Sequence, residues 1–120
     1  MVVEDDSFVI DIYRTKISQE GFNVVLASNG LEAIEKLSQG KEMPDLILLD
    51  IVMPYMDGLE TLEKIKKDEK IKNIPVILLT NLSQKEEVDK GLELGAVDYL
   101  IKSHFTPSEV MEKIRKNIKN

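Results

Sequence analysis

Five short apolar runs alternate with longer amphipathic segments along this chain. The runs lie at residues 1–3, 22–27, 45–50, 74–80 and 98–102. Three of them are rich in Val, Ile and Leu with little alternation, which is typical of parallel strands covered on both faces. The pattern predicts one α/β domain over residues 1–120, a doubly wound five-stranded parallel sheet with five helices on its two faces. The first run is unusually short, which leaves open a first strand truncated at the N-terminus.

Capping patterns predict where the helices begin and end. Four polar residues have an acidic residue three positions later, the spacing of a capping box: Asn29 with Glu32, Asp57 with Glu60, Ser83 with Glu86, and Thr106 with Glu109. We expect Asp6 or Ser7 to cap the first helix, and we interpret Asp57 as a cap rather than a metal ligand. Three glycines follow helical stretches, where a left-handed residue is needed: Gly21, Gly40 and Gly95.

Composition narrows the classes of function. The chain has 120 residues, no Cys and a net charge of −6. The absence of Cys excludes disulfides, a thiolate metal site and a Cys nucleophile, and it fits a cytoplasmic protein. No stretch is long and apolar enough to span a membrane. The acidic balance argues against direct binding of nucleic acid, because phosphate contacts need clustered Lys and Arg.

Polar residues gather at the carboxyl ends of the predicted strands. The first run ends in Glu4 and Asp5, the third in Asp50, the fourth in Thr80 and the fifth in Lys102. Ligands of an open parallel sheet bind at this edge. Clustered carboxylates favour Mg²⁺, which keeps several waters and leaves positions for phosphate oxygens. The Lys and Thr could hold the remaining oxygens of a phosphoryl group.

Four segments in this order and spacing resemble the receiver domain of two-component response regulators, of the chemotaxis-regulator type: "VVEDD", "LLDIVMPYMDG", "VILLT" and "YLIK". The similarity covers essentially the whole chain. It implies the strand order 2-1-3-4-5 and a role in signal transduction. It also implies Mg²⁺ as cofactor, and a sensor histidine kinase or phosphotransfer protein as partner.

The resemblance implies a role for each residue of the acidic site. Asp50 is the expected phosphoacceptor, which takes its phosphoryl group from a phosphohistidine. Asp5 and Asp50 would bind Mg²⁺ directly, together with the backbone carbonyl of Val52. Glu4 would reach the metal through a water molecule.

Three further residues are implied in the response to phosphorylation. Lys102 would pair with the phosphoryl oxygens, and Thr80 would move to hydrogen-bond one of them. Tyr99 would then change rotamer and alter the face formed by the fourth helix, fifth strand and fifth helix. A downstream protein would bind that face.

The chain departs from the family pattern at several positions. Ser103 follows Lys102 where Pro is usual, and a cis bond before Ser would cost about 2.5–4 kcal/mol against about 0.5–1 kcal/mol before Pro. Asn81 replaces a smaller residue. Val52 and Leu82 cannot position a water molecule by hydrogen bonding, so we predict slow self-dephosphorylation. His104, the only His, is expected to have no role.

Other functions compete with this one. The main alternative is a receiver-like module that binds protein partners without being phosphorylated, which the altered segment after Lys102 keeps open. A Mg²⁺-dependent phosphohydrolase of the haloacid-dehalogenase type needs a second Asp where Val52 stands. A flavodoxin-like carrier needs a phosphate loop, and the acids after the first strand would repel phosphate. We therefore expect a protein that catalyses only its own phosphorylation and dephosphorylation, and no separate enzyme activity.

Overall fold

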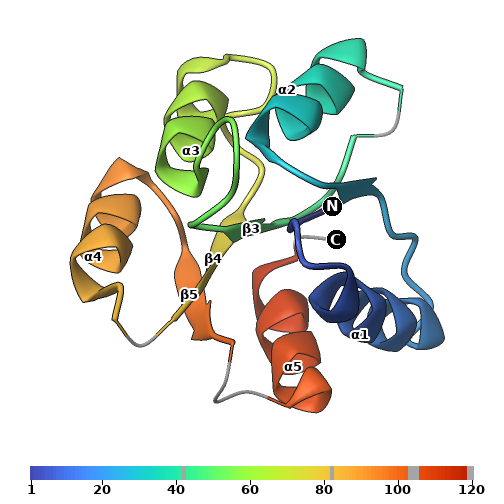
Figure 1. Ribbon diagram of the computed structural model, residues 1–120. Helices are drawn as coiled ribbons and strands as arrows, with labels where there is room; N and C mark the ends of the chain where they lie inside the picture. The colour runs from blue at the N-terminus through green and yellow to red at the C-terminus, as the bar shows by residue number, and fades with distance from the viewer. Residues whose placement is uncertain (42, 82, 103–105, 119–120) are drawn as a thin grey trace.

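Strands and helices alternate along the whole chain in the computed structural model, which describes residues 1–41, 43–81, 83–102 and 106–118 (Figure 1). The elements are β1 (Val2–Val3), α1 (Ser7–Gln19), β2 (Leu26–Ala27), α2 (Gly30–Gln39), β3 (Ile47–Asp50), α3 (Gly58–Lys67), β4 (Val76–Thr80), α4 (Lys85–Leu94), β5 (Asp98–Ile101) and α5 (Pro107–Asn117). The predicted α/β alternation is therefore confirmed.

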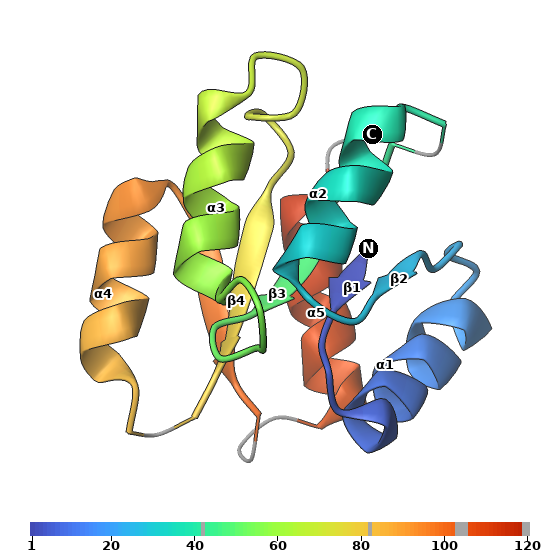
Figure 2. The same cartoon turned by 45° about the horizontal axis from the view of Figure 1, so that its top comes forward.

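All five strands form one parallel sheet in the order β2-β1-β3-β4-β5 (Figure 2). The register pairs Val3 with Leu49, Asp50 with Leu79, and Thr80 with Ile101. The order is the one that the resemblance implies. It places β1, β3 and β4 side by side, so that the acids after β1 and at the end of β3 lie on adjacent strands.

The helices cover both faces of the sheet, with α1 and α5 on one face and α2, α3 and α4 on the other (Figure 1). Every residue of β3 and β4 is buried. Alternate side chains enter two separate apolar clusters: Ile77 and Leu79 pack with α1 and α5, whereas Leu78 packs with α2 and α3. Burial on both faces is why these strands read as continuous apolar runs.

The second strand is shorter than predicted. The apolar run at 22–27 forms a strand only at Leu26–Ala27. As the edge strand it pairs with β1 alone, and β1 itself contains only two residues. The bonds beside this ladder run from Val2 N to Val25 O at 2.9 Å and from Glu4 N to Ala27 O at 3.0 Å. Pairing with so short a neighbour limits the length of β2.

Four of the predicted helix caps are confirmed. Backbone N–H groups donate to the side chains of Asp6, Asn29, Asp57 and Thr106. The prediction that Ser83 caps the fourth helix is wrong, because α4 begins at Lys85 and its N-cap is Gln84. The three predicted C-terminal glycines do have positive φ, at 92°, 66° and 116°. Among the described residues, no helix is long and apolar enough to cross a membrane.

Candidate functional site

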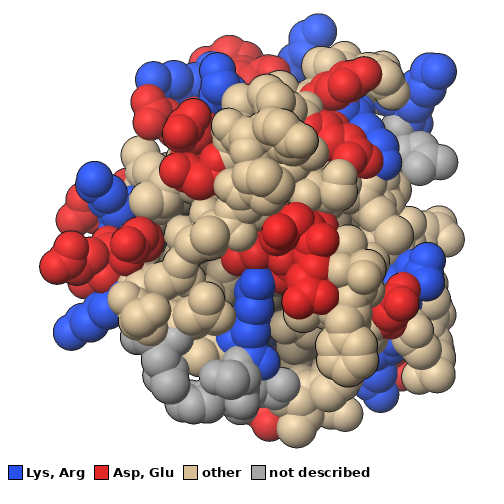
Figure 3. All heavy atoms as spheres, in the orientation of Figure 1, with Lys and Arg blue, Asp and Glu red and all other residues tan. Residues whose placement is uncertain are grey.

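The carboxyl ends of the strands bring the predicted site residues to one edge of the sheet. Glu4 and Asp5 follow β1, Asp50 ends β3, Thr80 ends β4 and Lys102 follows β5. Figure 3 shows this edge as a group of acidic side chains at the centre of the molecule, with a basic side chain against it. The sequence-based placement of the site is therefore consistent with the arrangement of the strands.

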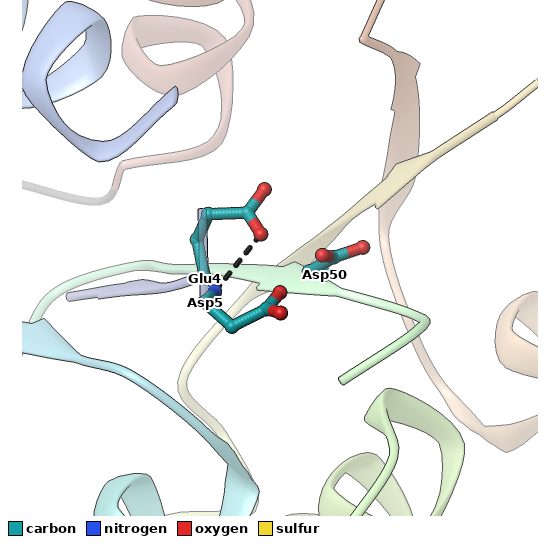
Figure 4. Close-up of side chains that lie close together, drawn as sticks. All are labelled: Glu4, Asp5 and Asp50. Carbon is teal, nitrogen blue, oxygen red and sulfur yellow. Dashed lines mark hydrogen bonds between the residues drawn. The ribbon is translucent and has the colours of Figure 1, made fainter. Parts of the chain in front are cut away.

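Three carboxylates from two neighbouring strands form the centre of the site. Glu4, Asp5 and Asp50 each offer an oxygen that lies within 4.8 Å of the others (Figure 4). Glu4 is 0% exposed and Asp50 is 3% exposed, whereas Asp5 is open to solvent. Two buried carboxylates so close together need positive charge nearby.

Lys102 supplies part of that charge. Its Nζ donates a hydrogen bond to Asp50 Oδ2 at 2.8 Å and lies 2.6 Å from Glu4 Oε1. The second contact lacks the direction of a hydrogen bond, so Glu4 Oε1 is held by charge alone. One ammonium facing three carboxylates leaves the site negative.

Two backbone hydrogen bonds to the other oxygen of Glu4 offset the cost of burying this carboxylate. Glu4 Oε2 accepts hydrogen bonds from Asp5 N at 2.9 Å and from Asp6 N at 3.3 Å. Burial, followed by the neighbouring Asp50, raises the pKa of Glu4. Burial, followed by the neighbouring Glu4, also raises the pKa of Asp5. Burial lowers the pKa of Lys102, but the hydrogen bond to Asp50 and the adjacent charge of Glu4 outweigh this, so the net pKa is raised and the ammonium stays charged.

The loop after β3 positions the other oxygen of Asp50. Val52 N lies 3.3 Å from Asp50 Oδ1 as a hydrogen-bond donor, and the Val52 side chain is 57% exposed. Farther along, Met56 N donates to Pro54 O at 2.8 Å across Tyr55, whose φ is +68°. This is a γ-turn of the strained kind. The role of the Val52 carbonyl as a metal ligand stays a prediction.

Thr80 is held by a residue that the sequence did not single out. Thr80 is 1% exposed, and its hydroxyl lies 3.0 Å from Gln84 Oε1 and 3.1 Å from Asn81 O, both acceptors. Asn81 N donates to the same Gln84 oxygen at 2.9 Å. Gln84 has no motif or periodicity that marks it, and the capping pattern pointed to its neighbour Ser83.

Tyr99 lies on the edge strand β5 and is 38% exposed. Lys113 Nζ lies 5.7 Å from the centre of the Tyr99 ring and donates to Tyr99 O at 3.1 Å. It also pairs with Asp98 at 2.9 Å. Its side chain is therefore accessible at the surface beside α5. The expected change of rotamer stays a prediction.

Several expectations lie outside the described residues. They concern the apolar Leu82, the bond between Lys102 and Ser103, and the absence of a role for His104. The residues that are described fit a hard divalent cation, because three carboxylates meet there and the open Asp5 leaves access from solvent.

Comparison with known proteins agrees with this geometry. The response regulator receiver domain family matches residues 1–115. A probable transcriptional regulator, ycf27, from Guillardia theta is 41% identical over 115 residues, which cover 96% of this chain and 43% of that protein. The chain spans about half the length of the curated relatives it matches.

Solved structures are similar over nearly the whole chain. The signal receiver domain of a signal transduction histidine kinase from Syntrophus aciditrophicus is 32% identical, with a TM-score of 0.85 over 96% of this chain and 85% of that one. The receiver domain of the sensor histidine kinase PA1611 from Pseudomonas aeruginosa is 26% identical, with a TM-score of 0.84 over 97% and 93%. A magnesium ion is coordinated in the active-site cleft of that protein. This chain belongs to the family of response regulator receiver domains.

Proposed function

We propose that this domain accepts a phosphoryl group on Asp50 from the phosphohistidine of a sensor histidine kinase or phosphotransfer protein. The observation that carries the proposal is the position of Asp50. It ends a buried strand, its Oδ2 is bonded to Lys102, and it lies beside Glu4 and Asp5. A buried carboxylate with an ammonium and two further carboxylates around it suits a metal-assisted nucleophile better than a structural ion pair.

The transfer is a displacement at phosphorus. An oxygen of Asp50 forms the new O–P bond while the N–P bond of the phosphohistidine breaks, and the imidazole nitrogen leaves with the electron pair. Lys102 keeps its ammonium beside the developing charge on the phosphoryl oxygens. Asp5, Asp50 and the Val52 carbonyl would hold Mg²⁺, with Glu4 reaching it through water. A Mg²⁺ ion bound there would neutralise part of the negative charge on the phosphoryl oxygens.

The output of the domain is a change in protein binding. Thr80 turns towards a phosphoryl oxygen, and Tyr99 changes rotamer on the face made by α4, β5 and α5. A downstream protein in the cytoplasm binds that face according to the state of Asp50. The domain catalyses only its own phosphorylation and slow dephosphorylation.

Intact mass after incubation with Mg²⁺ and a small phosphodonor, acetyl phosphate or phosphoramidate, tests the proposal. We expect a gain of one phosphoryl mass that disappears in Asp50→Asn and in a metal-free sample. Asp57→Asn is the matched control, since Asp57 is a nearby helix cap outside the carboxylate cluster. The absence of any adduct, even with the mimic beryllofluoride, would favour the alternative of a binding module that is not phosphorylated.

A further inference from the structure

Gln84 connects the Thr80 hydroxyl to the beginning of α4. Its Oε1 lies 3.0 Å from Thr80 Oγ1 and 2.9 Å from Asn81 N. A backbone N–H can only donate, so the atom that faces it is the amide oxygen and not the amide nitrogen. The oxygen is therefore an acceptor for both groups. The Gln84 side chain is buried, with the residue 8% exposed.

The same residue begins the helix. Gln84 is the N-cap of α4, yet its side chain makes no capping bond to the first turn. Val88 N donates to Gln84 O at 3.0 Å, which starts the helical ladder. The side chain instead folds back on the loop between β4 and α4. Short polar side chains at an N-cap normally accept bonds from the free N–H groups of their own helix, whereas the amide oxygen of Gln84 accepts from Thr80 and Asn81 instead.

Thr80 stands between the two strands that carry the chemistry. Asp50 of β3 is in register with Leu79, the residue before Thr80, and Lys102 N donates to Thr80 O at 2.9 Å. A hydroxyl has a single proton to donate. In the structure that proton is directed at the loop, to Gln84 or to Asn81 O. It serves a phosphoryl oxygen only after it leaves these acceptors.

We propose that Gln84 is a positioning residue that holds Thr80 in the resting state, so that release of the Thr80–Gln84 bond is part of every activation event. The proposal rests on the proposed function of Asp50 as phosphoacceptor. Release frees Thr80 for the phosphoryl group and Gln84 for the first turn of α4 in the same step. The bond thereby couples the chemistry at Asp50 to the start of a helix that borders the output face.

Removal of the amide oxygen tests the proposal. Gln84→Met keeps the length of the side chain, and the net worth of one hydrogen bond predicts that beryllofluoride with Mg²⁺ binds about 3- to 10-fold more tightly. Affinity is followed by titration of the Asn81 amide signal in NMR spectra. Gln84→Glu keeps an acceptor oxygen and should show no such gain. Ser83→Ala, an exposed change one residue earlier, should match the unaltered protein.

A Thr80→Val background separates positioning from general loosening of the loop. If Gln84 acts through the Thr80 hydroxyl, Gln84→Met has no effect on affinity once that hydroxyl is gone. A gain that persists in Thr80→Val, or a loss of affinity in Gln84→Met alone, would overturn the proposal. Urea unfolding of four proteins measures the coupling of Thr80 and Gln84 in the resting state, without any ligand. They are the unaltered protein, Gln84→Met, Thr80→Val and the double variant.

The two proposals fail in different ways. Coupling in the resting state without a gain in beryllofluoride affinity would refute the role of Gln84 in activation and leave the receiver function intact. No binding of beryllofluoride by the unaltered protein would refute the proposed function of Asp50, and with it any role of Gln84 in activation. No coupling at all would show that the bond does not hold Thr80.

Discussion

Gly58 packs directly against the backbone of Asp50. A β-carbon on Gly58 would stand 2.2 Å from the Asp50 carbonyl oxygen and 2.7 Å from Ile51 Cα. Gly58 N also donates to Ile51 O at 2.7 Å. The first residue of α3 therefore packs against the carboxyl end of β3 and is hydrogen-bonded to the residue that follows it. Glycine is required there for close approach, and the neighbouring atoms are backbone atoms that cannot turn aside.

We expect Gly58→Ala to lower the free energy of unfolding by about 1–3 kcal/mol, the usual cost of overpacking. Because the displaced atoms belong to Asp50, the affinity for Mg²⁺ should fall as well. Urea unfolding and calorimetric Mg²⁺ titration check the two effects. Gly21→Ala is the control, since Gly21 has a positive φ and nothing within 4 Å of an added β-carbon. It should lose stability through backbone strain and keep its Mg²⁺ affinity.

Removal of the ammonium of Lys102 leaves Glu4 and Asp50 facing each other without a counter-charge. We expect Lys102→Met to lower the free energy of unfolding by about 1–3 kcal/mol in metal-free buffer. Added Mg²⁺ should restore part of this loss, because it replaces the missing positive charge. Lys67→Met breaks only an exposed pair with Glu63 and should cost less than about 1 kcal/mol. Equal losses in the two variants would contradict the assigned role of Lys102.

Tyr55 occupies a strained turn with its side chain in solvent. It is 83% exposed and has φ of +68°, and glycine, which has no Cβ, adopts positive φ more readily than Tyr. We expect Tyr55→Gly to raise the free energy of unfolding by about 0.5–1 kcal/mol. Tyr55→Ala removes the ring but keeps the backbone penalty, and it should show no gain. A gain in both variants would mean that the exposed ring, and not the backbone, carries the cost.

Acid should remove a contribution of Glu32 to stability. Hydrogen bonds from the Ser28 hydroxyl and N–H, followed by Lys36, hold the pKa of Glu32 below its ordinary value of 4.5. A lowered folded pKa means that the stabilisation is complete above that value and is lost as the pH falls through the folded pKa. After allowance for solvent screening, Glu32→Gln should cost about 0.5 kcal/mol at neutral pH and nothing in strong acid. Unfolding measured from neutral pH to strong acid checks this, with Glu35→Gln on the same helix as the control.

The phosphorylated domain should lose its phosphoryl group slowly, with a half-life longer than seconds. The exposed Val52 side chain beside Asp50 has no group that could hold a water molecule for attack. Val52→Asn supplies such a group, and one hydrogen bond predicts hydrolysis about 3- to 10-fold faster. Decay of the adduct mass gives both rates. Rapid decay in the unaltered protein would contradict the prediction.

Much of the fold follows from local signals in the sequence. Apolar runs without alternation mark β3 and β4 because both faces of these strands are covered. Asn29 and Thr106 predict the beginnings of α2 and α5 because each cap bond joins residues only three positions apart. The beginning of β2 differs from the predicted one, since the length of this strand depends on how much of β1 is available to pair with it. That is a property of the sheet and not of the run itself.

The site was predictable only in part for a similar reason. Charged residues at the ends of strands are visible in the sequence, and the sheet brings Asp50 and Lys102 together. Gln84 was missed because its two bonds reach back to Thr80 and Asn81 in a tertiary arrangement that no spacing specifies. The Ser83 cap failed at the same place. The helix begins one residue later than the capping pattern predicts, and the side chain of its N-cap, Gln84, bonds to Thr80 instead of to the helix.

The edge strand β5 divides two tasks between its two sides. Leu100, and Lys102 just after the strand, alternate with Tyr99, so the side chain that touches Asp50 and the exposed ring of Tyr99 point in opposite directions. If the proposed function holds, Tyr99 is therefore the position to exchange for a new output, because its side chain points away from the Lys102 contact with Asp50. On the proposed function, a single short strand would keep partner recognition and the reactive carboxylate on separate faces.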